Sequence, residues 1–184
     1  MMSSNSGTAE MAHIHTEPGQ YDLTASAYIV RTSAPEPAIL LHKHKTLGWI
    51  MQPGGHVELN ETPWQAICHE IREETGYDMD QLQVLQPPLR LPTALGVDRH
   101  PQPLSISSFQ FSDIDHFHTD ITFVFTTDQN PRHNPGEDES PVLLWLTRQD
   151  LVDLDPTQTH EEILATALFI LDTVLHQWEP IHAS

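Results

Sequence analysis

The pattern of hydrophobic and polar positions divides the chain into short strands and two helices. Alternating or continuous short apolar runs predict strands at residues 23–31, 38–42, 82–85, 106–111, 120–127 and 142–146. Apolar positions at helical spacing predict one helix from Pro63 and a second that begins in a capping box at Thr159 and ends near Trp178. Strands grouped around one inner helix, with a second helix closing the chain, favour an α/β protein with an α/β/α sandwich and a mixed central sheet.

The first predicted helix has clear start and stop signals. Thr62 is a suitable N-cap, Pro63 occupies the first helical position, and Gln65 completes a capping box. Gly76 is placed to end the helix in a left-handed turn. At about 100° per residue, one arc of the helix is apolar and should face the core. It consists of Trp64, Ile67, Cys68, Ile71 and Thr75.

Three glutamates, Glu70, Glu73 and Glu74, lie on the flank of this helix, within about 100° of one another. They follow the turn Pro53-Gly54-Gly55 and the upstream Glu61. Like charges this close repel each other, so a fold that keeps them together needs a cation between them. Carboxylate oxygens suit Mg²⁺ or Mn²⁺, and a metal held in this way usually acts on phosphate oxygens. The alternative is a solvated acidic helix face, which does not explain the glycine turn or Glu61.

Around these glutamates the sequence resembles the signature of the Nudix hydrolase family, and the resemblance covers about residues 20–178. The matching positions are Gly55, Glu61, Glu70, Ile71, Glu73, Glu74 and Gly76. The resemblance implies that Glu70, Glu73 and Glu74, helped by the carbonyl of Gly54, hold Mg²⁺ or Mn²⁺. It also implies that Glu61 supports the geometry between loop and helix. The implied reaction is attack of water on phosphorus, which splits a nucleoside diphosphate linked to another group.

Two positions depart from the family signature. Tyr77 replaces an aliphatic residue, and its ring can fill an apolar site. His69 replaces an arginine that is thought to orient a metal-binding glutamate, and it is shorter and mostly neutral near pH 7. Arg72 is no substitute, because helical geometry puts it about 160° from Glu70. We expect metal binding to persist with a reduced or pH-dependent rate; an unchanged rate and pH profile in His69→Arg would contradict this.

The sequence leaves the residue that activates water open. Glu73 or Glu70 could act through the metal, or a carboxylate from the acidic loop at residues 130–141 could act as the base. Within that loop we prefer Glu139 to Glu137 and Asp138, because Glu139 is nearest the following strand and so best anchored.

Thirteen histidines are present, and several are clustered. On a strand, His116, His118 and Asp120 would share one face, opposite the apolar side chains of Ile121, Phe123 and Phe125. The polar side chains could contact the phosphate or base of a substrate, bind a transition metal, or line a solvent-facing strand edge without a ligand. Trp49 is a candidate for stacking on a substrate base, with core packing as the alternative.

The charge of the chain limits the partners. There are 26 acidic and 8 basic residues, and the net charge is −18. Such a surface repels nucleic-acid polymers and anionic membranes, so the expected partner is a small nucleotide-type molecule. The longest apolar run, residues 163–171, is too short to span a bilayer. The helix that contains it could serve the core or the seam of a homodimer.

Length and cysteine content set the remaining expectations. With 184 residues and 38% hydrophobic content, we expect a flexible tail at residues 1–19 and a single domain at residues 20–180. One cysteine, Cys68, cannot form an internal disulfide, and no signal peptide is visible, so a reducing cytoplasm is expected. Cys68 itself is expected to be a small buried hydrophobe.

These features together predict a metal-dependent hydrolase that cleaves a pyrophosphate bond in a nucleotide or nucleoside-diphosphate derivative. The alternative is a Nudix-like nucleotide-binding module with weak or no hydrolysis, which the His69 departure favours.

Overall fold

The computed structural model of the protein describes residues 16–33, 35–92, 96–97, 99–110 and 116–183. Nine strands within these residues form one sheet. They are β1 (Tyr21–Arg31), β2 (Ala38–Lys43), β3 (Ile50–Met51), β4 (Gly54–His56), β5 (Gln83–Gln86), β6 (Ser105–Gln110), β7 (Phe117–Thr127), β8 (Leu143–Thr147) and β9 (Glu179–His182). The helices are α1 (Pro63–Glu70), α2 (Arg148–Asp153), α3 (Glu161–Phe169) and α4 (Leu175–Gln177), with π-helical turns η2 (Ile71–Thr75) and η4 (Ile170–Val174) and a 3₁₀ turn η3 (Met79–Gln81).

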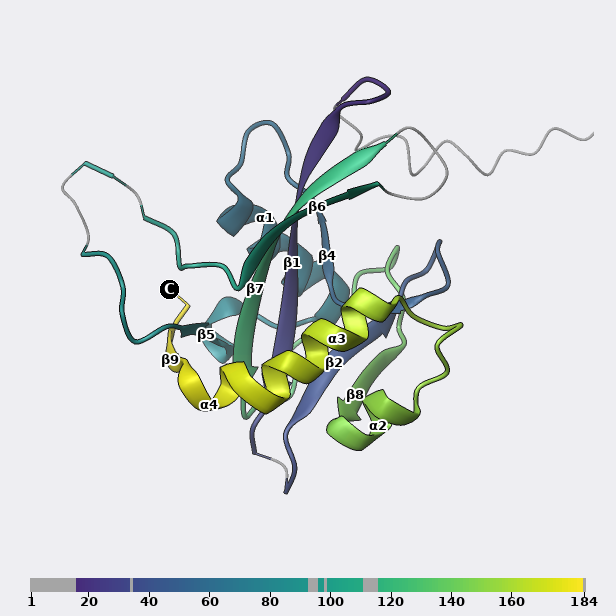
Figure 1. Cartoon of the computed structure of the whole chain (residues 1–184), viewed down its shortest axis with the longest axis vertical. Coiled ribbons are helices and arrows are strands. Elements are labelled where there is room, and N and C mark those ends of the chain that lie inside the picture. The colour runs from purple at the N-terminus through teal and green to yellow at the C-terminus, as the bar shows by residue number, and fades with distance from the viewer. Residues whose placement is uncertain (1–15, 34, 93–95, 98, 111–115, 184) are drawn as a thin grey trace, which may run out of the picture.

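The long strands β1 and β7 form the parallel centre of the sheet, paired from Tyr21 opposite Phe117 to Arg31 opposite Thr127. The main strand order is β3-β2-β1-β7-β5-β9, and β4, β6 and β8 pair with β1, β7 and β2. Every pair other than β1 and β7 is antiparallel. The sheet is therefore mixed, and Figure 1 shows α3 crossing in front of it and α1 behind it.

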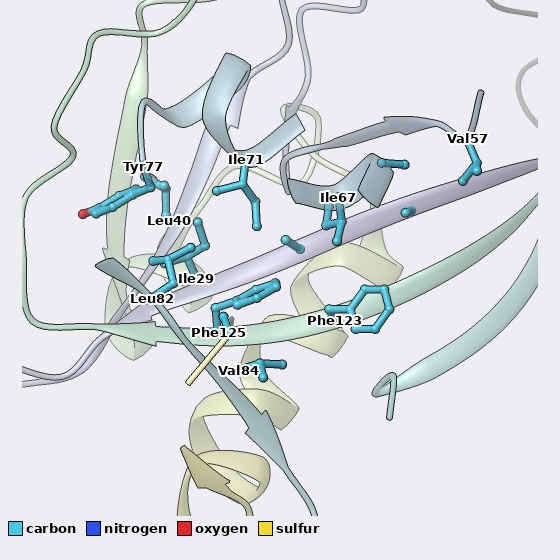
Figure 2. Close-up of a cluster of buried hydrophobic side chains, with 14 residues drawn as sticks. Ile29, Leu40, Val57, Ile67, Ile71, Tyr77, Leu82, Val84, Phe123 and Phe125 are labelled. Carbon is cyan, nitrogen blue, oxygen red and sulfur yellow. The ribbon is translucent and has the colours of Figure 1, made fainter. Parts of the chain in front are cut away.

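Alternation along the central strands divides the core between the two faces of the sheet, because successive side chains point to opposite sides. Ala25, Ala27 and Ile29 of β1 pack on the side of α1, whereas Tyr28 and Val30 pack on the side of α3. The helix formed by α1 and η2, which carries the signature glutamates, is called the box helix. Figure 2 shows the first core, in which side chains of the box helix meet those of the strands. Its fully buried leucine, isoleucine, valine and phenylalanine side chains each contribute about 1.5–3 kcal/mol relative to an exposed position.

The predicted fold class is confirmed, since a mixed sheet lies between helices on its two faces. All six predicted strands are present within a few residues, although Phe111, the predicted end of one strand, lies outside the described residues. The strands β3, β4 and β9 and the helix α2 were not predicted. Strands of two to four residues, one of them Gly-Gly-His, are too short to show an alternating pattern.

The C-terminal helical segment differs in detail from the prediction. Its N-cap is His160 and not Thr159: the Nδ1 atom of His160 accepts a hydrogen bond from the backbone N–H of Glu162 at 3.4 Å. Its apolar residues Ile163, Ala167 and Ile170 are buried against the sheet. This apolar face of the helix therefore packs in the core. That the protein forms a homodimer stays a prediction.

The predicted tail at residues 1–19 lies mostly outside the described residues. Its described end forms a turn, in which the backbone N–H of Gln20 donates to the carbonyl of Glu17 at 3.0 Å. Among the described residues, none of the helices is both long and apolar enough to cross a membrane.

Candidate active site

The predicted signals of the box helix are confirmed. Thr62 is the N-cap, with its hydroxyl accepting from the Gln65 backbone N–H at 3.3 Å, while the Gln65 side chain accepts from the Thr62 N–H at 2.9 Å. At the other end Gly76 has φ of 76°, and its N–H donates to the carbonyl of Arg72 at 3.0 Å. A left-handed conformation favours glycine, which explains why the helix ends there.

The second half of this helix widens into the π-helical turn η2, which α-helical periodicity did not predict. The wider turn contains Glu73 and Glu74 and follows Glu70 directly. Glu74 is buried, Glu70 is half-buried, and Glu73 is exposed. The three predicted ligands thus lie at increasing depth from solvent to core, and π-turns inside helices are frequent at functional sites.

Glu74 is the best-fixed carboxylate of the site. Its Oε2 atom accepts a hydrogen bond of 2.7 Å from the backbone N–H of Gly54, and only 4% of the residue is exposed. Burial, followed by the charge of Glu70, raises the pKa of Glu74 well above its ordinary value, and Glu139 and Glu73 act in the same direction. The structure therefore brings four acidic side chains together from the box helix and one distant loop.

A buried histidine adjoins this carboxylate. The Nε2 atom of His42 on β2 lies 3.7 Å from Oε1 of Glu74, and His42 is 1% exposed. Burial, followed by the charge of His44, lowers the pKa of His42 to about 4. The ring is therefore neutral at pH 7, and the contact supplies no positive charge to Glu74. A buried carboxylate among three others, beside a neutral ring, fits a divalent cation.

Both glycines of β4, the short strand before α1, lie in close contact with neighbouring groups. At Gly54, with φ of 152°, a Cβ would overlap the backbone of Ala25 and Ser26 on β1. At Gly55 a Cβ would overlap the carboxylate of Glu70. These contacts place β4 against β1 and the carboxylate of Glu70 against β4. Whether the Gly54 carbonyl is a metal ligand stays a prediction.

His69, the main departure from the family signature, contacts Glu61. Its Nδ1 atom lies 2.9 Å from Oε2 of Glu61, whose Oε1 accepts from the backbone N–H of Glu58 at 3.0 Å. His69 therefore ties the helix to the loop before it, which is the role expected for Glu61. Arg72 points elsewhere, as predicted, and its guanidinium donates to Asp78 at 2.7 Å.

The acidic loop at residues 130–141 packs on the C-terminal end of the box helix. Its Gly136 N–H donates to the carbonyl of Glu73 at 2.7 Å, and its His133 N–H donates to the carbonyl of Gly76 at 3.0 Å. Glu139 is half-buried and close enough to raise the pKa of Glu74. Glu137 and Asp138 are exposed. This placement supports the preference for Glu139, whose role as a base stays a prediction.

The predicted substrate-contact residues fall in two places. His116, His118 and Asp120 are buried on the sheet face opposite α1. The carboxylate of Asp120 accepts hydrogen bonds from the hydroxyls of Thr24, Ser26 and Thr122 at 2.7–2.9 Å. Trp49 is 47% exposed beside His160, with ring centroids 6.0 Å apart, so it does not serve the core.

Two histidines that lie beside the candidate site residues were not predicted from the sequence. His42 belongs to a short His-Lys-His run in the sequence, and its contact with Glu74 depends on how the helix packs on β2. His56 follows the glycine loop directly, and its ring centroid lies 4.9 Å from that of His118. The short strand β4, which was not predicted, brings His56 there through its pairing with β1.

Acid is expected to destabilise the protein through His42. Because the folded-state pKa is about 4 and the ordinary value is 6.5, the unfolded chain binds more protons between these values. The contribution of neutral His42 to the free energy of unfolding is complete above pH 6.5. It falls by about 3 kcal/mol as the pH decreases towards 4.

Denaturant unfolding across this pH range should show the loss. His42→Gln should have a shallower pH dependence than wild type, whereas His176→Gln, on exposed α4, should follow the wild type. Parallel pH profiles of wild type and His42→Gln would contradict this assignment.

Comparison with known proteins agrees with this geometry. The family model described as the NUDIX domain matches residues 21–167. YvcI, an uncharacterized Nudix hydrolase of Bacillus subtilis, is 26% identical over 117 residues, which cover 63% of this chain and 62% of YvcI. The match thus spans less than two thirds of that relative.

Two solved structures show the same fold. A NUDIX-family hydrolase from Clostridium perfringens superposes with a TM-score of 0.66 at 26% identity, covering 83% of this chain and 97% of that one. A binary complex of the C. elegans Ap4A hydrolase superposes with a TM-score of 0.56 at 18% identity, covering 78% and 93%. The fold and the glutamate-lined helix are those of a Nudix domain. With the family model matching most of its length, the chain belongs to the Nudix hydrolase family.

Proposed function

We propose that the protein hydrolyses a pyrophosphate bond in a nucleotide or nucleoside-diphosphate derivative, with Mg²⁺ or Mn²⁺ bound by Glu70, Glu73 and Glu74. One observation carries the proposal: Glu74 is buried among three other carboxylates, with its Oε2 fixed by the Gly54 N–H. Such an arrangement is costly unless a cation occupies it, because buried like charges repel strongly.

A divalent metal held there would neutralise charge on the phosphoryl oxygens and acidify the attacking water. Glu70, whose carboxylate lies beside Gly55, and Glu74, which accepts a hydrogen bond from Gly54, supply carboxylates held close to the glycine turn. Glu139 is the best-placed base from outside the helix, and one of its oxygens would accept the proton of the water. Attack would form a new P–O bond and break the bond to the bridging oxygen, and the leaving phosphate would take the electron pair and the proton that Glu139 accepted.

The proposed substrate is a small molecule. The net charge of −18 opposes binding of a nucleic-acid polymer, since few basic side chains are available to neutralise phosphates. The C. elegans protein with this fold is an Ap4A hydrolase, which makes dinucleoside polyphosphates a reasonable class to test. The single cysteine, half-buried in α1, is in keeping with the expected reducing cytoplasm.

A substrate panel tests this proposal. Nucleoside triphosphates, dinucleoside polyphosphates and nucleotide sugars would be incubated with the protein and Mg²⁺ in ¹⁸O-labelled water. We expect one class to be cleaved, with ¹⁸O in a phosphate of one product. No turnover of any class, with nucleotide binding still detectable by thermal shift, would contradict the proposal and favour a binding module.

The role of Glu139 is tested with a neighbour in the same loop. Glu139→Gln is expected to reduce kcat by 10²- to 10⁴-fold, the usual contribution of a general base, with KM little changed. Glu137→Gln is the matched control, because Glu137 is exposed, and it should retain the wild-type rate. Equal rates for the two variants would exclude Glu139 as the base.

A further inference from the structure

Three histidine side chains meet on the sheet face opposite the box helix. His118 belongs to β7, His116 is the residue before β7 begins, and His56 is the last residue of β4. The Nε2 atoms of His116 and His118 are 2.9 Å apart. One nitrogen from each of the three rings falls within 4.8 Å of the others. Imidazole nitrogens gathered this closely are the ligand set of a transition-metal site.

A carboxylate lies beside the three rings. The Oδ2 atom of Asp22 is 3.6 Å from Nε2 of His116 and 3.8 Å from Nε2 of His56. The strand pairing produces this arrangement, since Asp22 lies opposite His118 in the parallel pair and His56 lies opposite Thr24 of β1. Four potential ligands therefore come from three adjacent strands, β4, β1 and β7.

We propose that His56, His116, His118 and Asp22 bind a divalent transition-metal ion of the Zn²⁺ class. Tetrahedral zinc has Zn–N distances of about 2.0–2.1 Å, which separates its ligand atoms by about 3.3 Å. The three ring nitrogens lie within 4.8 Å of one another, and Oδ2 of Asp22 lies 3.6 and 3.8 Å from two of the rings, so small side-chain movements would bring these ligands to tetrahedral spacing. Mg²⁺ prefers oxygen ligands, so this site differs in metal class from the glutamate site.

Of the group His116, His118 and Asp120, which the sequence pattern placed on one face, only the two histidines belong to this site. Asp120 is not a ligand, because its oxygens already accept hydrogen bonds from three hydroxyl groups. Asp22 and His56, which are remote from His118 in sequence, take its place.

The burial of the ligands indicates a structural ion. The side chains of Asp22 and His116 are 4% and 7% exposed, and that of His56 is 21% exposed. A site with four protein ligands leaves no open position for a reacting molecule. The bound ion would instead join β4 to β1 and β7, and so fix the strand whose glycines contact Glu70 and Glu74.

Cobalt titration of the untagged full-length protein, with Mg²⁺ in excess, tests the proposal. Tetrahedral Co²⁺ absorbs visible light far more strongly than hydrated Co²⁺, so its spectrum reports the coordination. We expect one equivalent to bind with a tetrahedral spectrum and Zn²⁺ to displace it. Zn²⁺ at about 100 times its Kd should also raise Tm by roughly 5–10 °C.

Matched variants locate the binding. His116→Gln and His118→Gln should each weaken Co²⁺ binding by at least about 100-fold, since even outer-shell changes cost 10–100-fold. His176→Gln, the double variant His13→Gln/His15→Gln, and Glu73→Gln should bind like the wild type. The Glu73 variant also separates this site from the proposed catalytic metal.

The wild-type spectrum decides the matter even if a cluster variant fails to fold. No tetrahedral spectrum in the wild type, or a spectrum that persists in a folded His118→Gln variant, would overturn the proposal. The cluster would then be a metal-free polar contact, held by the hydrogen bond between the rings of His116 and His118.

Discussion

Replacing Glu74 with glutamine is expected to stabilise the metal-free protein and, in the presence of Mg²⁺, to lower the hydrolytic rate about 10³-fold. The glutamine oxygen can still accept the hydrogen bond from the Gly54 N–H, while the buried charge beside Glu70 is removed. Because burial and the neighbouring carboxylates disfavour the ionised form of Glu74, its replacement by a neutral side chain should stabilise the metal-free protein and raise Tm. The rate falls because metal assistance supplies several kcal/mol to the transition state.

Two measurements with EDTA-treated protein and a control variant test this expectation. Thermal unfolding should show the higher Tm of Glu74→Gln without metal, and added Mg²⁺ should raise Tm in the wild type but not in the variant. Glu36→Gln, a change at an exposed loop glutamate, should leave Tm and rate unchanged. A metal-free Glu74→Gln protein that is less stable than wild type would mean that the Glu74 charge is compensated within the protein.

Replacing Gly55 with alanine is expected to reduce the rate by about 10²-fold while the fold is retained. A Cβ at this position would overlap the carboxylate of Glu70, which must then move or change rotamer. Displacing a catalytic group by about 1 Å can cost 10²-fold in rate. Since Gly55 has no positive φ, the backbone accepts alanine and the effect falls on Glu70.

Gly136→Ala provides the matched control for this substitution. A Cβ there would meet Glu139 and the carbonyl of Glu73 at 3.6 Å, an ordinary van der Waals distance. It adds the same methyl group close to the same site, so its rate should stay within about twofold of wild type. A Gly55→Ala variant as active as Gly136→Ala would show that the position of Glu70 is not critical.

Local signals in the sequence were sufficient to predict the box helix and its ends. The capping residues Thr62 and Gln65 and the terminal glycine Gly76 each act within a few residues of their partners. The signature glutamates are local for the same reason, since they share one helix. The Nudix family and the mixed sheet were therefore accessible before the structure, and both are confirmed.

Features that depend on strand pairing could not be predicted in this way. The contact of His42 with Glu74 and the approach of Asp22 to His116 join residues more than thirty positions apart. The first depends on how the helix packs on the sheet and the second on strand register, and no pattern within a single element specifies either. The π-helical turn was also missed, because a widened turn has no distinct apolar periodicity over five residues.

Hydrolysis is expected to depend on a divalent metal held by Glu70, Glu73 and Glu74. The most direct test is the rate of the substrate identified in the panel as a function of Mg²⁺ concentration, for EDTA-treated wild type and Glu73→Gln. We predict no turnover without Mg²⁺, saturable activation in the wild type, and at least about 10²-fold less activity in the variant at every concentration. Full turnover in EDTA, or identical activation curves for the two proteins, would contradict the account.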